Sequence, residues 1–376
     1  VYAQQYDFEL YSNFTFFNND PINGDQIRQK ERRNMFGGSS ELNYVLPNSN
    51  HLIQVGISVR NDQSNDNELS RTLNRKTTLS TIQLGNINET NLGSYANAEL
   101  EFGKWLINPS VRLDYFKFTY EDLLSTEYDF QSNNQQIFSP KLNVFYNYSY
   151  NLQGYLKLGK GFHANDSRVS VSERQTIPAA YGSDLGVIWK PTKRLFVNAA
   201  LWYLYLDQEF VYVGDEGVVE PSGRTQRLGI DIGGRYQLTD WMFLDVDVNY
   251  AKARSLDATE NEGFIPLAPI LTSTGGLSIQ KNGWYGSWKY RFVGDRAANE
   301  DYSITADGYF IADLNIGKEW KNLNFSVNIE NLFNSEWNET QFATETRLFD
   351  ELESVEEIHF TPGTPLNLRF NLSYTF

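Results

Sequence analysis

Cysteine is absent from this sequence, and long apolar runs are absent as well. Without cysteine the chain can have no disulfide framework, no thiolate-bound zinc and no thiol nucleophile. No stretch approaches the roughly 18 consecutive apolar residues that a membrane-spanning helix needs, which excludes a helical membrane protein. Only three histidines occur among 376 residues. A three-histidine metal centre is therefore not expected, and no metal or cofactor site is predicted.

Basic residues are scarce relative to acidic ones. Lys and Arg total 32 against 47 Asp and Glu, which gives a formal net charge of -15. A nucleic-acid-binding protein presents a basic face, so we expect no nucleic-acid partner. The acidic balance suits a protein that meets cationic or metal-bearing ligands, and equally one whose charge simply keeps it in solution.

Aromatic residues are abundant instead, with 25 Phe, 23 Tyr and 8 Trp. This abundance argues against disorder. The mean hydropathy is nevertheless polar, at -0.49. A transmembrane β-barrel combines these two properties, because its apolar residues occupy alternate positions and window averages conceal them.

Strict alternation of apolar and polar residues is clearest at the end of the chain. In Leu366–Phe376 every even position is apolar or aromatic and every odd one is polar. A tilted strand crosses a bilayer in about 9–11 residues, which this segment matches. Further strands with the same pattern are 242–250, 310–316 and 323–330. Alternating runs of this kind, with turn residues between them, predict about sixteen strands along the chain.

The connections between the predicted strands alternate between short and long. The short ones are 47–50, 103–104, 150–153, 191–193, 239–240, 281–282 and 321–322. The long ones are 18–32, 63–91, 120–137, 164–180, 211–224, 256–269, 296–306 and 337–363. Outer-membrane barrels have tight periplasmic turns and long extracellular loops. We therefore predict an all-β, antiparallel transmembrane barrel over residues 1–376, against the alternative of a soluble β-sandwich or propeller with one wet face.

Candidate ligand contacts follow from the same alternation. A charge in lipid costs several kcal/mol, so charged residues within strands should face the barrel lumen. Charged strand residues that alternate with apolar ones are Arg112, Asp114, Asp245, Asp247, Lys289, Arg291 and Arg369. Of these, we take Asp245, Asp247, Arg291 and Arg369 as candidate ligand contacts. A second candidate group opens a long outer loop and consists of His163, Asp166, Arg168 and Arg174. The alternative for this group is a solvated loop that happens to be polar.

Two segments at the end of the chain resemble TonB-dependent outer-membrane receptors. Phe325–Asn334 resembles the penultimate-strand motif of that family, and Pro362–Phe376 resembles its final strand. Gly159–Asp166 is similar to the family's mid-barrel strand end, and Tyr181–Gly186 to the start of the strand after it. The terminal Phe376 resembles the signal that the barrel assembly machinery reads.

The resemblance implies a receptor in the outer membrane of a Gram-negative bacterium. Such receptors have a 22-stranded barrel filled by an N-terminal plug. They import an iron–siderophore, haem, cobalamin or glycan ligand with energy from the TonB complex, delivered through the plug. Because only about sixteen strands and no plug are recognisable, we expect this chain to be the C-terminal part of a larger receptor.

The resemblance also implies partners and leaves one alternative. The implied partners are the TonB energy-transducing complex through the missing plug, the barrel assembly machinery through the strand ending at Phe376, outer-membrane lipid, and a small-molecule or chelate ligand. The alternative is a self-contained passive porin, for which sixteen strands is a known size. An outer-membrane enzyme would need an acid–base pair at the outer rim, and no convincing set is present, so we predict no enzymatic activity.

Overall fold

A computed structural model describes residues 1–163, 177–213, 218–259 and 262–376. The described residues contain no helix, and hence none long and apolar enough to cross a membrane. They contain the following strands: β1 (Tyr2–Ser12), β2 (Ile27–Val45), β3 (Leu52–Leu73), β4 (Thr77–Phe102), β5 (Trp105–Asp122), β6 (Asp129–Ser149), β7 (Leu152–Phe162), β8 (Ala179–Thr192), β9 (Leu195–Val213), β10 (Val218–Thr239), β11 (Met242–Ser255), β12 (Leu271–Lys281), β13 (Trp284–Val293), β14 (Arg296–Ala297), β15 (Thr305–Ala306), β16 (Tyr309–Trp320), β17 (Leu323–Glu330), β18 (Asn338–Thr346), β19 (Val355–Pro362) and β20 (Asn367–Tyr374).

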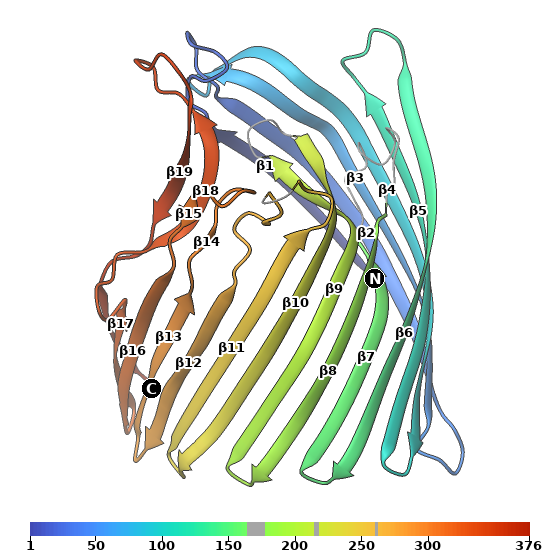
Figure 1. Ribbon diagram of the computed structural model, residues 1–376, viewed down its shortest axis with the longest axis vertical. Coiled ribbons are helices and arrows are strands. Elements are labelled where there is room, and N and C mark those ends of the chain that lie inside the picture. The colour runs from blue at the N-terminus through green and yellow to red at the C-terminus, as the bar shows by residue number, and fades with distance from the viewer. Residues whose placement is uncertain (164–176, 214–217, 260–261) are drawn as a thin grey trace.

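Sixteen of these strands form one antiparallel sheet in which each strand pairs with the next along the chain. The sheet curves into a tall, open wall (Figure 1), and the space on its concave side is called the lumen below. The two remaining pairs, β14–β15 and β18–β19, lie within the connections that precede β16 and β20. The expected all-β antiparallel architecture of sixteen strands is thus confirmed. Within the described residues β1 and β20 do not pair with each other, so the sheet is not closed.

Alternation along each strand separates two faces of the wall. Opposite residues in a register share a face. Val248 of β11 lies opposite Ile232 of β10, whereas Asp247 lies opposite Gly233. The apolar face is strongly exposed, reaching 62% for Phe370 and 72% for Leu372 on β20. An apolar band of this size is stable in contact with hydrocarbon and would aggregate in water, so this face is the lipid-facing one.

One end of the wall has tight turns. Between β12 and β13 the turn consists of Asn282 and Gly283, with φ values of 54° and 78°. Positive φ at both central residues matches the twist of the flanking strands and favours Asn-Gly. Aromatic side chains exposed near this end include Trp105, Trp189 and Trp320. Their position is that of the interfacial aromatic girdle of a barrel.

The opposite end differs from the sequence prediction at several connections. The one expected at 18–32 lies at 13–26, and within the one expected at 211–224 β9 runs to Val213 and β10 begins at Val218. The largest differences are on β3–β6. Residues 63–91 were expected to form a long connection, but β3 continues to Leu73 and β4 begins at Thr77. Similarly, the connection expected at 120–137 is reduced to 123–128. Here both faces of the strands carry polar residues, so the apolar alternation disappears although backbone pairing continues. These strands therefore extend well beyond the apolar band.

A small buried core lies on the inner face of these extensions. Phe116, Phe118, Ile137 and Ile177 are each at most 7% exposed, and Phe162 packs against them. Phe116 and Phe118 alternate with outward-facing residues on β5 and follow the inward-facing Asp114. On β5 and β6 above the membrane band, buried apolar residues therefore lie on the inner face.

Candidate ligand-binding surface of the lumen wall

The inner face of β5 carries a buried ion pair. Arg112 donates through Nε to Asp114 Oδ2 at 2.6 Å and through Nη2 to Asp114 Oδ1 at 2.7 Å. The Asp114 side chain is fully buried. Gly93 on β4 lies directly beside the pair, and a Cβ there would be 2.3 Å from Arg112 Nη2. The pair neutralises the carboxylate and fixes the guanidinium, so it belongs to the wall rather than to a ligand site.

Asp245 and Asp247 face the lumen as predicted, but an arginine accompanies them. Arg235 of β10 donates to both oxygens of Asp247, at 2.6 and 3.2 Å. In the strand register Arg235 lies opposite Asp245. The structure thus brings both predicted residues together around one cation, and this leaves a single excess negative charge. A contact between a ligand and these carboxylates remains a prediction.

Arg369 also lies on the inner face, on β20. Its Nη2 is 3.6 Å from Glu330 Oε1 on β17, and the two side chains are 61% and 45% exposed. Exposed pairs at such a distance contribute little to stability. Arg369 therefore keeps most of its hydrogen-bonding capacity for another partner.

Arg291 of β13 lies against two aromatic rings that also contact each other. Its guanidinium carbon is 5.4 Å from the ring centre of Tyr309 and 5.1 Å from that of Trp337. The two rings are themselves 5.0 Å apart, and Trp337 donates through Nε1 to the Thr364 carbonyl oxygen at 3.1 Å. Cation–π contact holds the guanidinium plane without occupying its N–H donors.

Arg291 differs from most other lumen arginines in its partners. Arg112, Arg235 and Arg369 each lie within 4 Å of a carboxylate, whereas no carboxylate of the described residues lies within that distance of Arg291. A guanidinium presents donors in a planar fork that fits carboxylate or phosphate groups. Chemically, this site can accept an anionic group from the lumen and place a planar ligand against aromatic rings.

A row of amide side chains crosses five neighbouring strands of the inner face. Each donates to the next at 2.6–2.9 Å, in the order Asn143, Asn108, Asn97, Gln54 and Asn43. The row lies toward the end with tight turns and carries no net charge. It offers amide hydrogen bonds to whatever fills this part of the lumen, without the cost of burying a charge.

The predicted outer-loop group is described only at its first residue. His163 follows β7, is exposed, and its backbone N–H donates to the Pro178 carbonyl oxygen at 3.3 Å. Asp166, Arg168 and Arg174 lie outside the described residues. Contact of this group with a ligand is therefore still a prediction.

Charged groups at the outer rim form hydrogen bonds with nearby residues of the rim. Arg224 donates to Asp257 Oδ1 at 2.5 Å, and this contact holds the pKa of the Asp257 carboxyl below its usual range. Backbone and hydroxyl donation from Ser303 lowers the pKa of Asp301 in the same way. No group of three or more His, Asp or Glu suited to a metal ion occurs in the described part of the chain.

Two lumen features escaped sequence analysis. Tyr309 and Trp337, which hold Arg291, belong to β16 and to the connection after β17, and nothing in their spacing shows that they meet. The amide row is visible only as isolated polar positions in separate strands. In the sequence, the amide row shows only in that each of its residues occupies a polar, lumen-facing position of the alternating pattern.

Comparison with known proteins identifies the same architecture. Residues 1–332 match the protein family described as "TonB dependent receptor-like, beta-barrel". No curated protein matches the sequence.

The unliganded ferric citrate transporter FecA superposes with a TM-score of 0.77 at 14% identity, covering 100% of this chain and 58% of that one. The ferric yersiniabactin uptake receptor FyuA from Yersinia pestis gives 0.77 at 12% identity, with coverages of 100% and 58%. The copper transporter OprC gives 0.73 at 14% identity, with coverages of 100% and 61%. The chain thus spans about three fifths of these structures.

Proposed function

Because the chain belongs to the TonB-dependent receptor β-barrel family, we propose that it forms the wall and outer loops of a receptor that imports a scarce ligand across the outer membrane of a Gram-negative bacterium. Transport requires no chemical step, so no residue is assigned a catalytic role. The whole receptor would include a plug inside the lumen, through which the TonB complex supplies energy.

The unpaired edges of the sheet support a larger barrel. Among the described residues, strands β1 and β20 each have one edge without a partner strand, and free edges of long strands are templates for further pairing. We propose that additional strands of the receptor pair with these edges and close the wall. The alternating strand that ends at Phe376 would be read by the barrel assembly machinery.

The observation that carries the ligand proposal is the environment of Arg291. A lumen guanidinium held by Tyr309 and Trp337, with no carboxylate of the described residues within 4 Å, favours a ligand that brings its own negative charge. Of the ligand classes considered, iron–siderophore complexes and haem both bring negative charge and planar groups, and we take the iron–siderophore class as the first to test. The proteins that superpose are described as transporters or receptors of iron chelates and copper.

Growth of a receptor-deletion strain tests this proposal. The full-length receptor, with its plug and signal sequence, should restore growth on one or more iron chelates when these are the sole iron source. Cobalamin, haem and glycans serve as parallel substrates. Arg291→Ala should raise the chelate concentration for half-maximal growth about tenfold, since a charge-assisted hydrogen bond contributes about 1.5–3 kcal/mol. Arg194→Ala, at an exposed pair with Asp240, is the matched control and should leave growth unchanged.

Two outcomes count against the proposal. Uptake of small solutes that needs no TonB, together with a stable ion conductance in planar bilayers, would favour the porin alternative. Equal growth of the Arg291→Ala and wild-type strains on every chelate would reject the assigned ligand contact while leaving the receptor assignment intact.

A further inference from the structure

Two Asn-Gly dipeptides occur in the sequence, and the fold places them in different surroundings. Asn23–Gly24 lies in the connection between β1 and β2, whereas Asn282–Gly283 forms the two-residue turn between β12 and β13. Asparagine is a thermolabile residue. A following glycine has no Cβ, so it leaves its own backbone nitrogen open to a reaction with the asparagine side chain. Both dipeptides are therefore chemically susceptible to loss of the asparagine amide.

This loss takes two steps, with water as the only co-reactant. First, the glycine backbone nitrogen bonds to the asparagine Cγ, and the bond from Cγ to the amide nitrogen breaks. The proton of the glycine N–H leaves with that amide as ammonia, and a cyclic succinimide remains. Water then opens either carbonyl of the ring, which gives an aspartyl or an isoaspartyl residue. The first step requires a glycine N–H that can lose its proton and a side-chain amide that is free to approach it.

Both groups are free at Asn282–Gly283. Among the described residues, neither the Gly283 backbone N–H nor the Asn282 side chain has a hydrogen-bond partner, and both residues are exposed. The backbone N–H of Glu319 donates to the Gly283 carbonyl oxygen at 2.8 Å, which ties the turn to β16. The reacting groups are therefore unprotected, in a turn whose position beside β16 is fixed.

Lys318 of β16 is placed to promote the first step. It donates through Nζ to the Asn282 carbonyl oxygen at 2.6 Å, and its Nζ lies 5.1 Å from the centre of the Trp284 ring. Resonance in the Asn282–Gly283 peptide group joins this oxygen to the Gly283 nitrogen. The negative charge that develops when the nitrogen loses its proton is therefore shared with an oxygen that already accepts from a cation. A donor placed in advance stabilises such a charge as it develops.

At Asn23–Gly24 the same groups are engaged, and all of them by Asp20. The Gly24 backbone N–H donates to the Asp20 carbonyl oxygen at 3.0 Å, and Asn23 Nδ2 donates to Asp20 Oδ2 at 3.0 Å. Asp20 Oδ1 also accepts from the Asn23 backbone N–H at 2.9 Å. A carboxylate beside this peptide opposes a further negative charge. The engaged proton, the held amide and the local charge therefore all disfavour reaction at Asn23.

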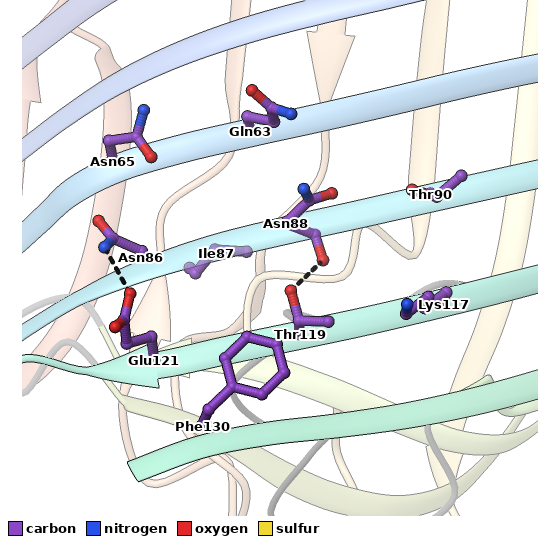
Figure 2. Close-up of a pocket in the computed structure, with 10 residues that line it drawn as sticks. All are labelled: Gln63, Asn65, Asn86, Ile87, Asn88, Thr90, Lys117, Thr119, Glu121 and Phe130. Carbon is purple, nitrogen blue, oxygen red and sulfur yellow. Dashed lines mark hydrogen bonds between the residues drawn. The ribbon is translucent and has the colours of Figure 1, made fainter. Parts of the chain in front are cut away.

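Asparagines within the strands are held in another way. Asn86 lies in β4 opposite Glu121 of β5 and donates to its Oε2 at 2.9 Å (Figure 2). Ile87 follows it, and its β-branched side chain crowds the backbone nitrogen that would have to react. Asn86 therefore provides a protected reference in the same molecule.

We propose that Asn282 is a site of spontaneous deamidation in the folded protein, promoted by Lys318, and that Asn23 is protected. The product carries a new carboxylate next to Lys318 at the end of the wall with tight turns. Its isoaspartyl form also adds one methylene to the main chain of a turn whose geometry depends on its two central residues. The inference rests on the turn and its neighbours, and it is independent of the proposed ligand and of transport.

Peptide mapping of the purified full-length receptor tests the proposal. The folded protein in detergent is incubated at pH 8 and constant temperature, and mass spectrometry follows the replacement of amide by carboxyl at Asn282, Asn23 and Asn86. We expect deamidation at Asn282 to be at least tenfold faster than at either other position. Lys318→Gln should slow it at least threefold, because the cation is lost. Lys321→Gln, in the turn between β16 and β17, is the matched control and should leave the rate unchanged.

Unfolding separates the effect of structure from that of local sequence. In urea the two Asn-Gly dipeptides lose their neighbours, and their rates should agree within about twofold. Heat-modifiable migration in gel electrophoresis checks that each variant has a folded barrel.

Three results would overturn the proposal: equal rates at Asn282 and Asn23 in the folded wild type, a difference between them that persists in urea, or equal rates in Lys318→Gln and the wild type. The first comparison uses no variant, so it holds even if a variant fails to fold. A receptor that deamidates at Asn282 but imports no chelate would contradict the proposed function alone.

Discussion

Arg347 donates through Nε to the carbonyl oxygen of Phe17 at 3.0 Å, although the two residues are 330 positions apart. A backbone bridge between Phe16 and Arg347 and an edge-on contact between Phe17 and Phe349 accompany this bond. The first outer connection and the β18–β19 pair are thereby joined at the outer rim (Figure 1). The ends of the open sheet are therefore held together by loop contacts rather than by strand pairing.

Replacing Arg347 by Ala should loosen this junction. Hydrogen bonds that involve a charged group contribute about 1.5–3 kcal/mol, so we expect earlier proteolytic cleavage within residues 13–26 and little change in the barrel itself. Mass spectrometry of a limited-proteolysis time course locates the cleavage. Arg194→Ala, at the end with tight turns, should cleave like the wild type. Cleavage at equal rates in both variants would show that Arg347 does not hold the junction.

Removal of Arg112 should destabilise the barrel strongly. It would leave the buried Asp114 with only a 3.2 Å contact from Asn91, and an uncompensated buried charge costs about 3–5 kcal/mol. Urea unfolding followed by tryptophan fluorescence in detergent measures the change. Arg369→Ala, at an exposed pair, should cost at most about 1 kcal/mol. Similar losses in the two variants would mean that burial of Asp114 is not what makes its ion pair strong.

Much of the wall could be predicted from the sequence, because lipid on one side and water on the other impose a period of two that survives in each strand. Alternation at Leu366–Phe376 locates β20 almost to the residue. The same signal fails for residues 63–91, where polar side chains occupy both faces, including the buried Ser64 and Ser70. Pairing there is fixed by neighbouring backbones, which leave no mark in the side-chain pattern.

The strand residues among the predicted site, such as Asp247 and Arg291, lie on the lumen face as their alternation predicts, but their partners were not predictable. Asp247 faces the lumen as its alternation requires, yet its pairing with Arg235 depends on the register between β10 and β11. Arg291 meets Trp337 only because a long connection folds back over β13. The register between two strands and the path of a long loop depend on residues that are far apart in the sequence. A single sequence therefore does not show them directly.

The contact between Arg224 and Asp257 should respond to acid. Because the folded-state pKa of Asp257 is lowered, the stabilisation is present above the unfolded-state pKa of about 3.9 and is lost as pH falls through the lower folded value. Hydrogen exchange, corrected for intrinsic rates, should therefore show constant protection at the outer end of β11 from pH 8 to 5 and reduced protection below pH 4.

Asp257→Asn provides the test of that assignment. The variant should show reduced protection in this segment at every pH and no further loss on acidification. Asp240→Asn, at the opposite end of the wall, should behave like the wild type in this segment. Acid-dependent loss that persists in Asp257→Asn would assign the response to another group.

The central claim is that successive side chains alternate between hydrocarbon and an aqueous lumen, and spin-label accessibility on β11 tests it most directly. Because the chain has no cysteine, single substitutions at Asp245, Val246, Asp247 and Val248 can each carry one nitroxide without background labelling. In bilayers, collision with oxygen should be high at 246 and 248, and collision with a water-soluble nickel chelate should be high at 245 and 247. High nickel accessibility at all four positions, in a protein that stays monodisperse without detergent, would contradict the account.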